Sequence, residues 1–167
     1  NHNLDQYHLF HKRSALNPRM GGFGVDHQHH FGSTYIDRRV IMKKKLIFAG
    51  LGGSMRYNDG ENQYTEFQMI LRILSLVPKL LWNRLFRGRF VDILVTHAPP
   101  CGIHDKDDNA HRGFKSFLWF MRTFRPGYLL HGHIHLYDLH ERRITRYYDT
   151  EVINVYDHYL LELETNG

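Results

Sequence analysis

The sequence is organised around one short stretch, Tyr128-Leu129-Leu130-His131-Gly132-His133-Ile134-His135. A short apolar run ends at Gly132, and two histidines follow it with a single residue between them. In an extended backbone, residues i and i+2 point to the same side, so His133 and His135 are expected to direct their imidazoles into one space. Neutral imidazole is the commonest metal ligand among protein side chains. The stretch therefore predicts a strand that ends at a candidate metal site.

A second stretch, Phe90-Val91-Asp92-Ile93-Leu94-Val95-Thr96-His97-Ala98-Pro99-Pro100, has the same form. An apolar strand is again followed by a histidine, His97, and by a turn. Apart from Asp92 the strand is apolar on both faces, as expected of a central strand that is covered on both sides. Sites in open α/β sheets lie at the carboxyl ends of the strands. Two strands that each deliver histidine at this end predict an α/β fold with its site there.

Length and composition are those of an ordinary globular domain. The chain has 167 residues, of which 42% are hydrophobic and 23% charged, and this is enough to bury a core. The formal charge of +5 favours an anionic partner. The single cysteine, Cys101, cannot form an internal disulfide, which favours a reducing compartment, and we expect a cytoplasmic protein. No apolar run approaches membrane-spanning length, so no membrane partner is expected.

Two segments divide the chain. Residues 1–20 show neither helical nor alternating periodicity, and we expect a poorly ordered tail there. One domain without an internal linker is expected over residues 21–167. Its first part, 25–30, is rich in possible ligands and includes Asp26, although a histidine cluster of this kind more often binds metal adventitiously.

Strands are predicted over residues 38–42 and 45–49. The second runs into a glycine-rich loop whose Gly52 and Gly53 are candidate substrate-binding residues, because glycine permits close approach of the backbone to a ligand. A plain tight turn is the alternative. Towards the end of the chain, alternation predicts antiparallel strands over 144–148, 152–156 and 159–163.

Helices are predicted in two regions. The spacing of Thr65 and Gln68 is that of a capping box and predicts a helix start. An apolar stripe of helical period follows, and Pro78 is expected to end or kink this helix before a second piece that stops at Gly88. The stripe consists of Phe67, Ile70, Leu71, Leu74 and Val77. A further amphipathic helix is predicted over 114–124 and is ended by Pro126 and Gly127.

The two histidine-bearing motifs, Thr96-His97-Ala98-Pro99-Pro100 and Gly132-His133-Ile134-His135, resemble the last two motifs of calcineurin-like metallophosphoesterases. Segments 50–66, 102–114 and 151–156 are similar to the same family. The resemblance implies part of a sandwich of two mixed β-sheets flanked by helices, with two divalent transition metals (manganese, iron or zinc) at the strand ends. It also implies that His97 and His133 ligate one metal and that His135 ligates the other.

The chain departs from the family at its amino-terminal side. The family begins with a strand carrying Asp-x-His and continues with Gly-Asp and Gly-Asn-His-Asp, and the first two are not found here. Gly24-Val25-Asp26 resembles a remnant of the third motif, which makes Asp26 a further candidate metal ligand. We therefore expect an N-terminally incomplete domain with one metal site and little activity of its own.

The polar loop after Pro100 supplies the remaining candidates. His104, His111 and Arg112 could protonate a leaving group or clamp a phosphate, and they fit equally well in a solvated loop. The predicted function is metal-dependent hydrolysis of phosphomonoesters or phosphodiesters, with a phosphate-ester small molecule or a nucleotide as substrate.

Three alternatives remain open. One is a mononuclear zinc hydrolase that uses only His97, His133 and His135, since three histidines can hold zinc with a fourth position open for water. Another is a non-catalytic interaction module on the same fold. The third is nucleic-acid binding, but the basic residues form separate short clusters at 43–45 and 142–143 instead of one groove.

Overall fold

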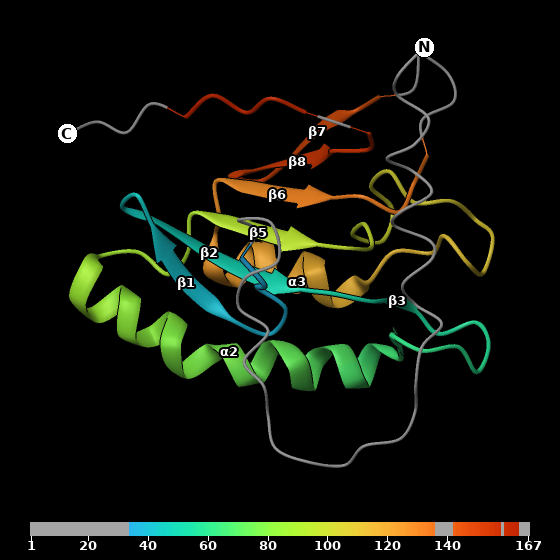
Figure 1. Ribbon diagram of the computed structural model, residues 1–167, viewed down its shortest axis with the longest axis horizontal. Coiled ribbons are helices and arrows are strands. Elements are labelled where there is room, and N and C mark those ends of the chain that lie inside the picture. Colours follow the sequence, from blue (N-terminus) through green and yellow to red (C-terminus); the bar gives the residue numbers. More distant parts are fainter. Residues whose placement is uncertain (1–33, 136–141, 158, 164–167) are drawn as a thin grey trace, which may run out of the picture. The chain divides into compact units, whose positions relative to one another are not determined.

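The computed structural model describes residues 34–135, 142–157 and 159–163. The described residues from Ile36 onwards form one compact unit, and everything below concerns this unit. The predicted boundary between tail and domain at residue 20 lies outside the described residues, as does Asp26. In chain order the elements are β1 (Val40–Lys43), β2 (Leu46–Leu51), β3 (Ser54–Met55), β4 (Gln63–Tyr64), α2 (Glu66–Arg87), β5 (Ile93–Thr96), α3 (Lys115–Phe124), β6 (Tyr128–His131), β7 (Ile144–Tyr147) and β8 (Thr150–Asn154) (Figure 1).

Six of the strands form one mixed sheet in the order β1-β2-β5-β6-β8-β7. The four inner strands, β2, β5, β6 and β8, run parallel, and β1 and β7 pair antiparallel at the two edges. Strands β3 and β4 form a separate two-stranded sheet. The predicted α/β class is thus confirmed.

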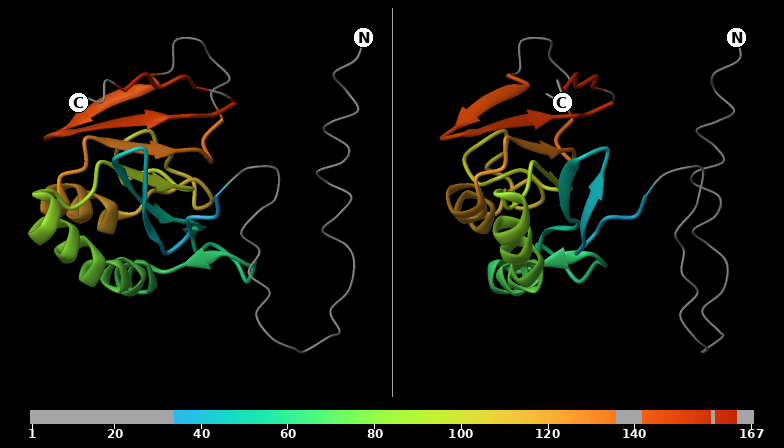
Figure 2. Two further views of the ribbon diagram at one scale, coloured as in Figure 1. Left: turned by 60° about the vertical axis from the view of Figure 1, so that its left-hand side comes forward. Right: turned by 90° about the vertical axis from the view of Figure 1, so that its left-hand side faces the viewer.

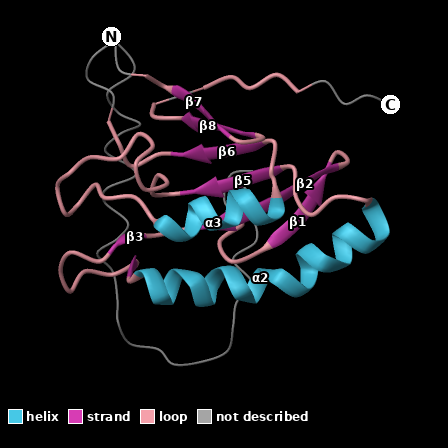
Figure 3. Cartoon of the chain, turned by 180° about the vertical axis from the view of Figure 1, so that it is seen from behind, coloured by secondary structure: helices cyan, strands magenta, loops and turns pink. Residues whose placement is uncertain are grey.

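Both helices cover the same face of the six-stranded sheet (Figures 2 and 3). The strand register gives this face a continuous apolar surface, because one row of core residues crosses five strands side by side. Side chains alternate between the two faces of a strand, so all five residues of the row point towards the helices. The row is Val40, Ala49, Leu94, Leu129 and Val152, each at most 5% exposed. Burial of each of the larger side chains contributes about 1.5–3 kcal/mol.

Helix α2 begins as the sequence predicts. The Thr65 side chain accepts a hydrogen bond from the backbone N–H of Gln68, and the Gln68 side chain accepts from the backbone N–H of Thr65. Gly88, with φ of 74°, ends the helix in the left-handed conformation.

Pro78 does not end α2, contrary to one of the two outcomes expected from the sequence. A single helix of 22 residues runs through it and changes direction along its length (Figure 3). Packing of Leu76 and Leu80 against the core, on either side of the proline, outweighs the backbone hydrogen bond that proline cannot donate. None of the helices in the described ranges is long and apolar enough to cross a membrane.

The buried face of α2 is not the stripe that the sequence analysis singled out. Met69, Ile73, Leu76 and Leu80 face the core, whereas four of the five predicted stripe residues face solvent. Both faces of this helix are apolar, so periodicity alone cannot decide which of them packs on the sheet.

The carboxyl-terminal part of the chain is folded partly as predicted. Strands β7 and β8 form the expected antiparallel pair, but residues 159–163 are not in a strand. The reason is the sheet order, because β8 already pairs with β6 on one side and β7 on the other. The Asn154 side chain marks the end of β8, where its amide donates to the carbonyl of Ile134 and its carbonyl oxygen accepts from the N–H of Tyr156.

Candidate functional site

The parallel strands bring their carboxyl ends together in register. Leu51, Thr96, His131 and Asn154, the last residues of β2, β5, β6 and β8, lie side by side across the sheet. The residues that follow these four strands therefore leave the sheet together, at the carboxyl ends of the strands. The N–H of Gly132 donates to the carbonyl of His97 over 3.2 Å, which fixes the turn after β6 beside the turn after β5.

His97 and His133 lie together at these carboxyl ends, with ring centroids 4.7 Å apart. His133 has a φ of 65°, in the left-handed region that a side chain other than glycine rarely adopts. Its Nε2 lies 2.8 Å from the carbonyl oxygen of Ala110, so Nε2 carries the proton and donates it there, which leaves the Nδ1 lone pair available. Burial, and secondarily the nearby His133, lowers the pKa of His97 and favours its neutral form.

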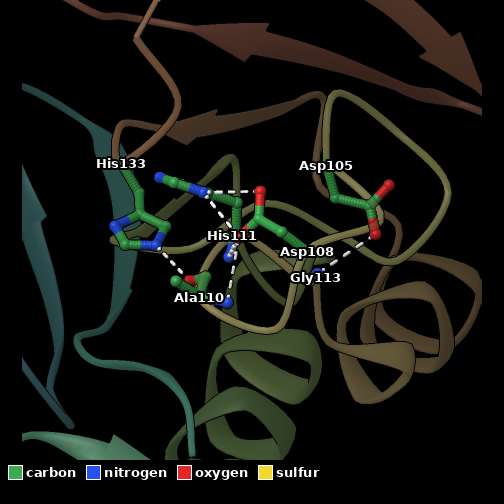
Figure 4. A network of polar contacts seen from close by, with 6 residues as sticks. All are labelled: Asp105, Asp108, Ala110, His111, Gly113 and His133. Atoms are coloured by element: carbon green, nitrogen blue, oxygen red, sulfur yellow. Dashed lines mark hydrogen bonds and ion pairs between the residues drawn. The ribbon is translucent and has the colours of Figure 1, made fainter. Parts of the chain in front are cut away.

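The loop between β5 and α3 is held by its own carboxylates (Figure 4). Asp105 accepts from the N–H groups of Gly102 and Gly113, over 2.9 and 3.1 Å. Asp108 accepts from the N–H groups of Ala110 and His111 and from Nδ1 of His111, the last over 2.8 Å. The hydrogen bond from the His111 side chain lowers the pKa of Asp108. These hydrogen bonds within the loop therefore fix its conformation.

His111 is placed against the histidine pair by this loop. Its ring centroid lies 5.2 Å from that of His133, and its ring is hydrogen-bonded to Asp108 (Figure 4). Arg112, its neighbour in the chain, is exposed. Of these two sequence candidates, the structure brings His111 to the site.

His104 belongs to a different cluster. Its Nδ1 lies 2.9 Å from Nε2 of His131, and its Nε2 lies 2.9 Å from the hydroxyl of Thr145. Nδ1 of His131 lies 3.0 Å from the carbonyl oxygen of Gly132 and must donate to it. The protons then follow one direction: Thr145 donates to His104, His104 to His131, and His131 to Gly132. Both rings are neutral in this chain of hydrogen bonds.

Burial depresses the basicity of both rings. His131 is fully buried, and its pKa is lowered to about 4, mainly by burial. The pKa of His104 is also lowered, first by burial and then by the charge of Arg142. His131 gives no sign of this role in the sequence, where it stands only as the last residue of an apolar run.

His135 points to a third place. Its ring stacks on that of Tyr156, with centroids 4.5 Å apart and an interplanar angle of 27°. In the part of the chain that the structure describes, no three His, Cys, Asp or Glu side chains form a group that could hold a metal ion. The expectation that His133 and His135 direct their imidazoles into one space is not borne out, because β6 ends at His131 and His133 has a left-handed backbone conformation. Metal binding by these histidines stays a prediction.

The glycines after β2 have neighbours of their own. The N–H of Gly52 donates to Oδ1 of Asp37 over 2.6 Å, and Arg72 binds the same oxygen at 2.6 Å. Gly53 has a φ of 96°, and a side chain there would collide with the ring of Tyr64. Close approach does explain both glycines, but the groups that approach are protein side chains. The ion pair between Asp37 and Arg72 could not be predicted from the sequence, because the two residues are far apart along the chain.

Comparison with known proteins adds little. The chain matches no protein-family model and no curated protein. It is similar to a solved structure at 16% sequence identity and a TM-score of 0.49, over 72% of this chain and 44% of that one. It thus spans less than half the length of that structure. A likeness of this degree shows neither a family nor an activity. The function proposed below therefore rests on the chemistry of the site.

Proposed function

We propose that this chain belongs to a metal-dependent phosphoester hydrolase. The observation that carries the proposal is the pair of imidazoles of His97 and His133, whose ring centroids lie 4.7 Å apart at the carboxyl ends of neighbouring parallel strands. The hydrogen bond from His133 to the Ala110 carbonyl is of the kind that fixes the tautomer and direction of a metal-ligating imidazole.

The donor set fits a divalent transition metal. Imidazole nitrogen suits zinc, iron and manganese, and the lowered pKa of His97 keeps its lone pair free at neutral pH. In the proposed site His97 and His133 hold one metal. When bound, such metals neutralise phosphate oxygens and make water a better nucleophile.

Proton transfer is assigned to the pair of His111 and Asp108. The carboxylate accepts from Nδ1 of His111 and so orients the ring, as in other acid–base pairs. Nε2 of His111 then has the role of giving a proton to the leaving oxygen of a phosphate ester bound at His133. The substrate class that this supports is a phosphate-ester small molecule or a nucleotide.

The sandwich architecture is part of the same proposal. On the sheet face opposite the helices, Phe48, Val95 and Leu130 are only partly buried, whereas Ile93 and Ile153 on the same face are buried. Parallel strands are normally covered on both faces. A second sheet packed on this face would bury these side chains and give two mixed sheets flanked by helices.

Titration of the metal-free chain with Co²⁺, followed by its visible absorption, tests the metal site. We expect His97→Ala and His133→Ala each to weaken binding at the pair by at least about tenfold. His104→Ala is the matched control and should leave binding unchanged. The titration should be done in a background where six other histidines are replaced by asparagine: His2, His8, His11, His27, His29 and His30. Unchanged cobalt binding in both His97→Ala and His133→Ala would refute the proposed site.

A further inference from the structure

Helix α2 exposes an unusual number of large apolar side chains. Eight of them, which we call the α2 stripe, are each between 37% and 77% exposed. They are Phe67, Ile70, Leu71, Leu74, Leu81, Trp82, Leu85 and Phe86. These are additional to the side of the same helix that packs on the sheet.

The size of the stripe matches an interface. Together its side chains present on the order of 800 Å² of accessible surface, which is what each partner contributes to a standard protein–protein interface. Soluble monomers rarely expose contiguous apolar patches beyond a few hundred Å². The α2 stripe is therefore expected to be covered.

The spacing of the stripe indicates a helix as its partner. Phe67, Leu71, Leu74, Pro78, Leu81 and Leu85 follow one another in alternate steps of four and three residues. This is the 3.5-residue repeat of a seam between two packed helices. With a period of 3.6 residues per turn, the same positions stay on one side of a helix of this length.

The positions of the stripe residues are also symmetric about the middle of the helix. Measured from Leu76, Phe67 lies as far towards the amino end as Leu85 lies towards the carboxyl end. The same holds for Leu71 with Leu81 and for Ile70 with Trp82. A two-fold interface requires a self-complementary surface, and an antiparallel pair of α2 helices would bring each of these residues opposite its counterpart.

Charge favours the antiparallel arrangement. Asp59 and Glu61 are exposed just before α2, and Arg84 and Arg87 are exposed in its last turn. An antiparallel pair places the acidic end of each copy beside the basic end of the other, whereas a parallel pair would bring like charges together. The helix dipoles are also opposed in this arrangement.

We propose that two copies of this chain associate through their α2 stripes, antiparallel about a two-fold axis that crosses the exposed side of α2 at the level of Leu76. Leu71 of one copy then faces Leu81 of the other, and Ile70 faces Trp82. The sheet edge with the histidines plays no part in this contact, so the dimer is independent of the proposed hydrolase activity.

Sedimentation equilibrium of the full chain over a concentration series tests the proposal. We expect a reversible dimer, and Leu71→Glu or Leu81→Lys alone should raise its dissociation constant by about 100-fold or more, because each buries an unpaired charge. Both positions are half-exposed in one copy, so folding is expected to persist, and circular dichroism checks this.

The double variant Leu71→Glu/Leu81→Lys identifies the arrangement. In the antiparallel dimer the new carboxylate at position 71 meets the new ammonium at position 81 of the other copy, and most of the lost affinity should return. Leu71→Glu/Leu74→Lys carries the same two charges without this pairing and should stay monomeric. Leu160→Glu, at an exposed position outside α2, should dimerise normally.

A wild-type chain that is monomeric throughout the series would overturn the proposal, as would failure of the charge pair to restore association. Binding to phosphatidylcholine vesicles by a monomeric wild type, lost in Leu71→Glu, would also overturn it and would assign the stripe to a lipid surface.

Discussion

Acidification should unfold this protein through the buried pair His104 and His131. Each ring is neutral and donates to the next acceptor, so protonating His131 would direct an N–H of one ring at an N–H of the other. His131 is fully buried, and its pKa is lowered to about 4. The unfolded chain takes up the same proton near pH 6.5.

The magnitude follows from this difference. A pKa of about 4 in the folded state against 6.5 in the unfolded state corresponds to about 3 kcal/mol. This contribution is complete above pH 6.5, falls as the pH drops, and is gone near pH 4, because the unfolded state binds the proton first. The lowered pKa of His104 acts in the same direction.

Urea denaturation between pH 7.5 and 4.5 measures the effect in the wild type and in His131→Leu. We expect the stability of the wild type to fall below pH 6.5 with a slope approaching about 1.4 kcal/mol per pH unit in excess of the variant. The variant is expected to be less stable at neutral pH, because the N–H of His104 loses its acceptor. The slopes therefore decide the outcome, and parallel pH dependences in the two proteins would refute the role of His131.

Three further results are expected. Glu66→Ala should cost about 1–2 kcal/mol of stability in thermal denaturation, because the carboxylate accepts from the first two backbone N–H groups of α3; Glu61→Ala is the exposed control, and equal losses would contradict this role. Gly50→Ala should cost about 2–3 kcal/mol, because its methyl group would collide with the backbone of Ile36; a stability within about 0.5 kcal/mol of wild type would show that the strand can yield. If the chain has phosphodiesterase activity with Mn²⁺, His111→Asn should lower kcat about 100-fold for a phenyl leaving group and much less for a nitrophenyl one; equal losses would exclude a proton donor.

The elements that the sequence predicted well are those fixed by local chemistry. Thr65 and Gln68 form the capping box within four residues, and Gly88 ends α2 through its own backbone freedom. His97 and His133 were also predictable as neighbours, because each follows an apolar run that forms a parallel strand. Strand ends in one sheet are brought together by the fold itself.

The features that the sequence left undecided or predicted wrongly depend on contacts between distant segments. Whether Pro78 breaks a helix is decided by the core around Leu76 and Leu80, and whether residues 159–163 form a strand is decided by the partners of β8. The chain of hydrogen bonds from Thr145 to His131 joins three separate segments and leaves no pattern in any of them. Local periodicity contains no information on such choices.

One residue of the candidate site, His133, holds a backbone conformation that favours glycine, with a φ of 65°. Such a residue costs about 1 kcal/mol relative to a glycine in the same place. Stability and site chemistry are therefore opposed at this position. A library of variants selected only for resistance to heat is expected to accumulate glycine or asparagine at position 133, and these variants should be the ones that lose cobalt binding.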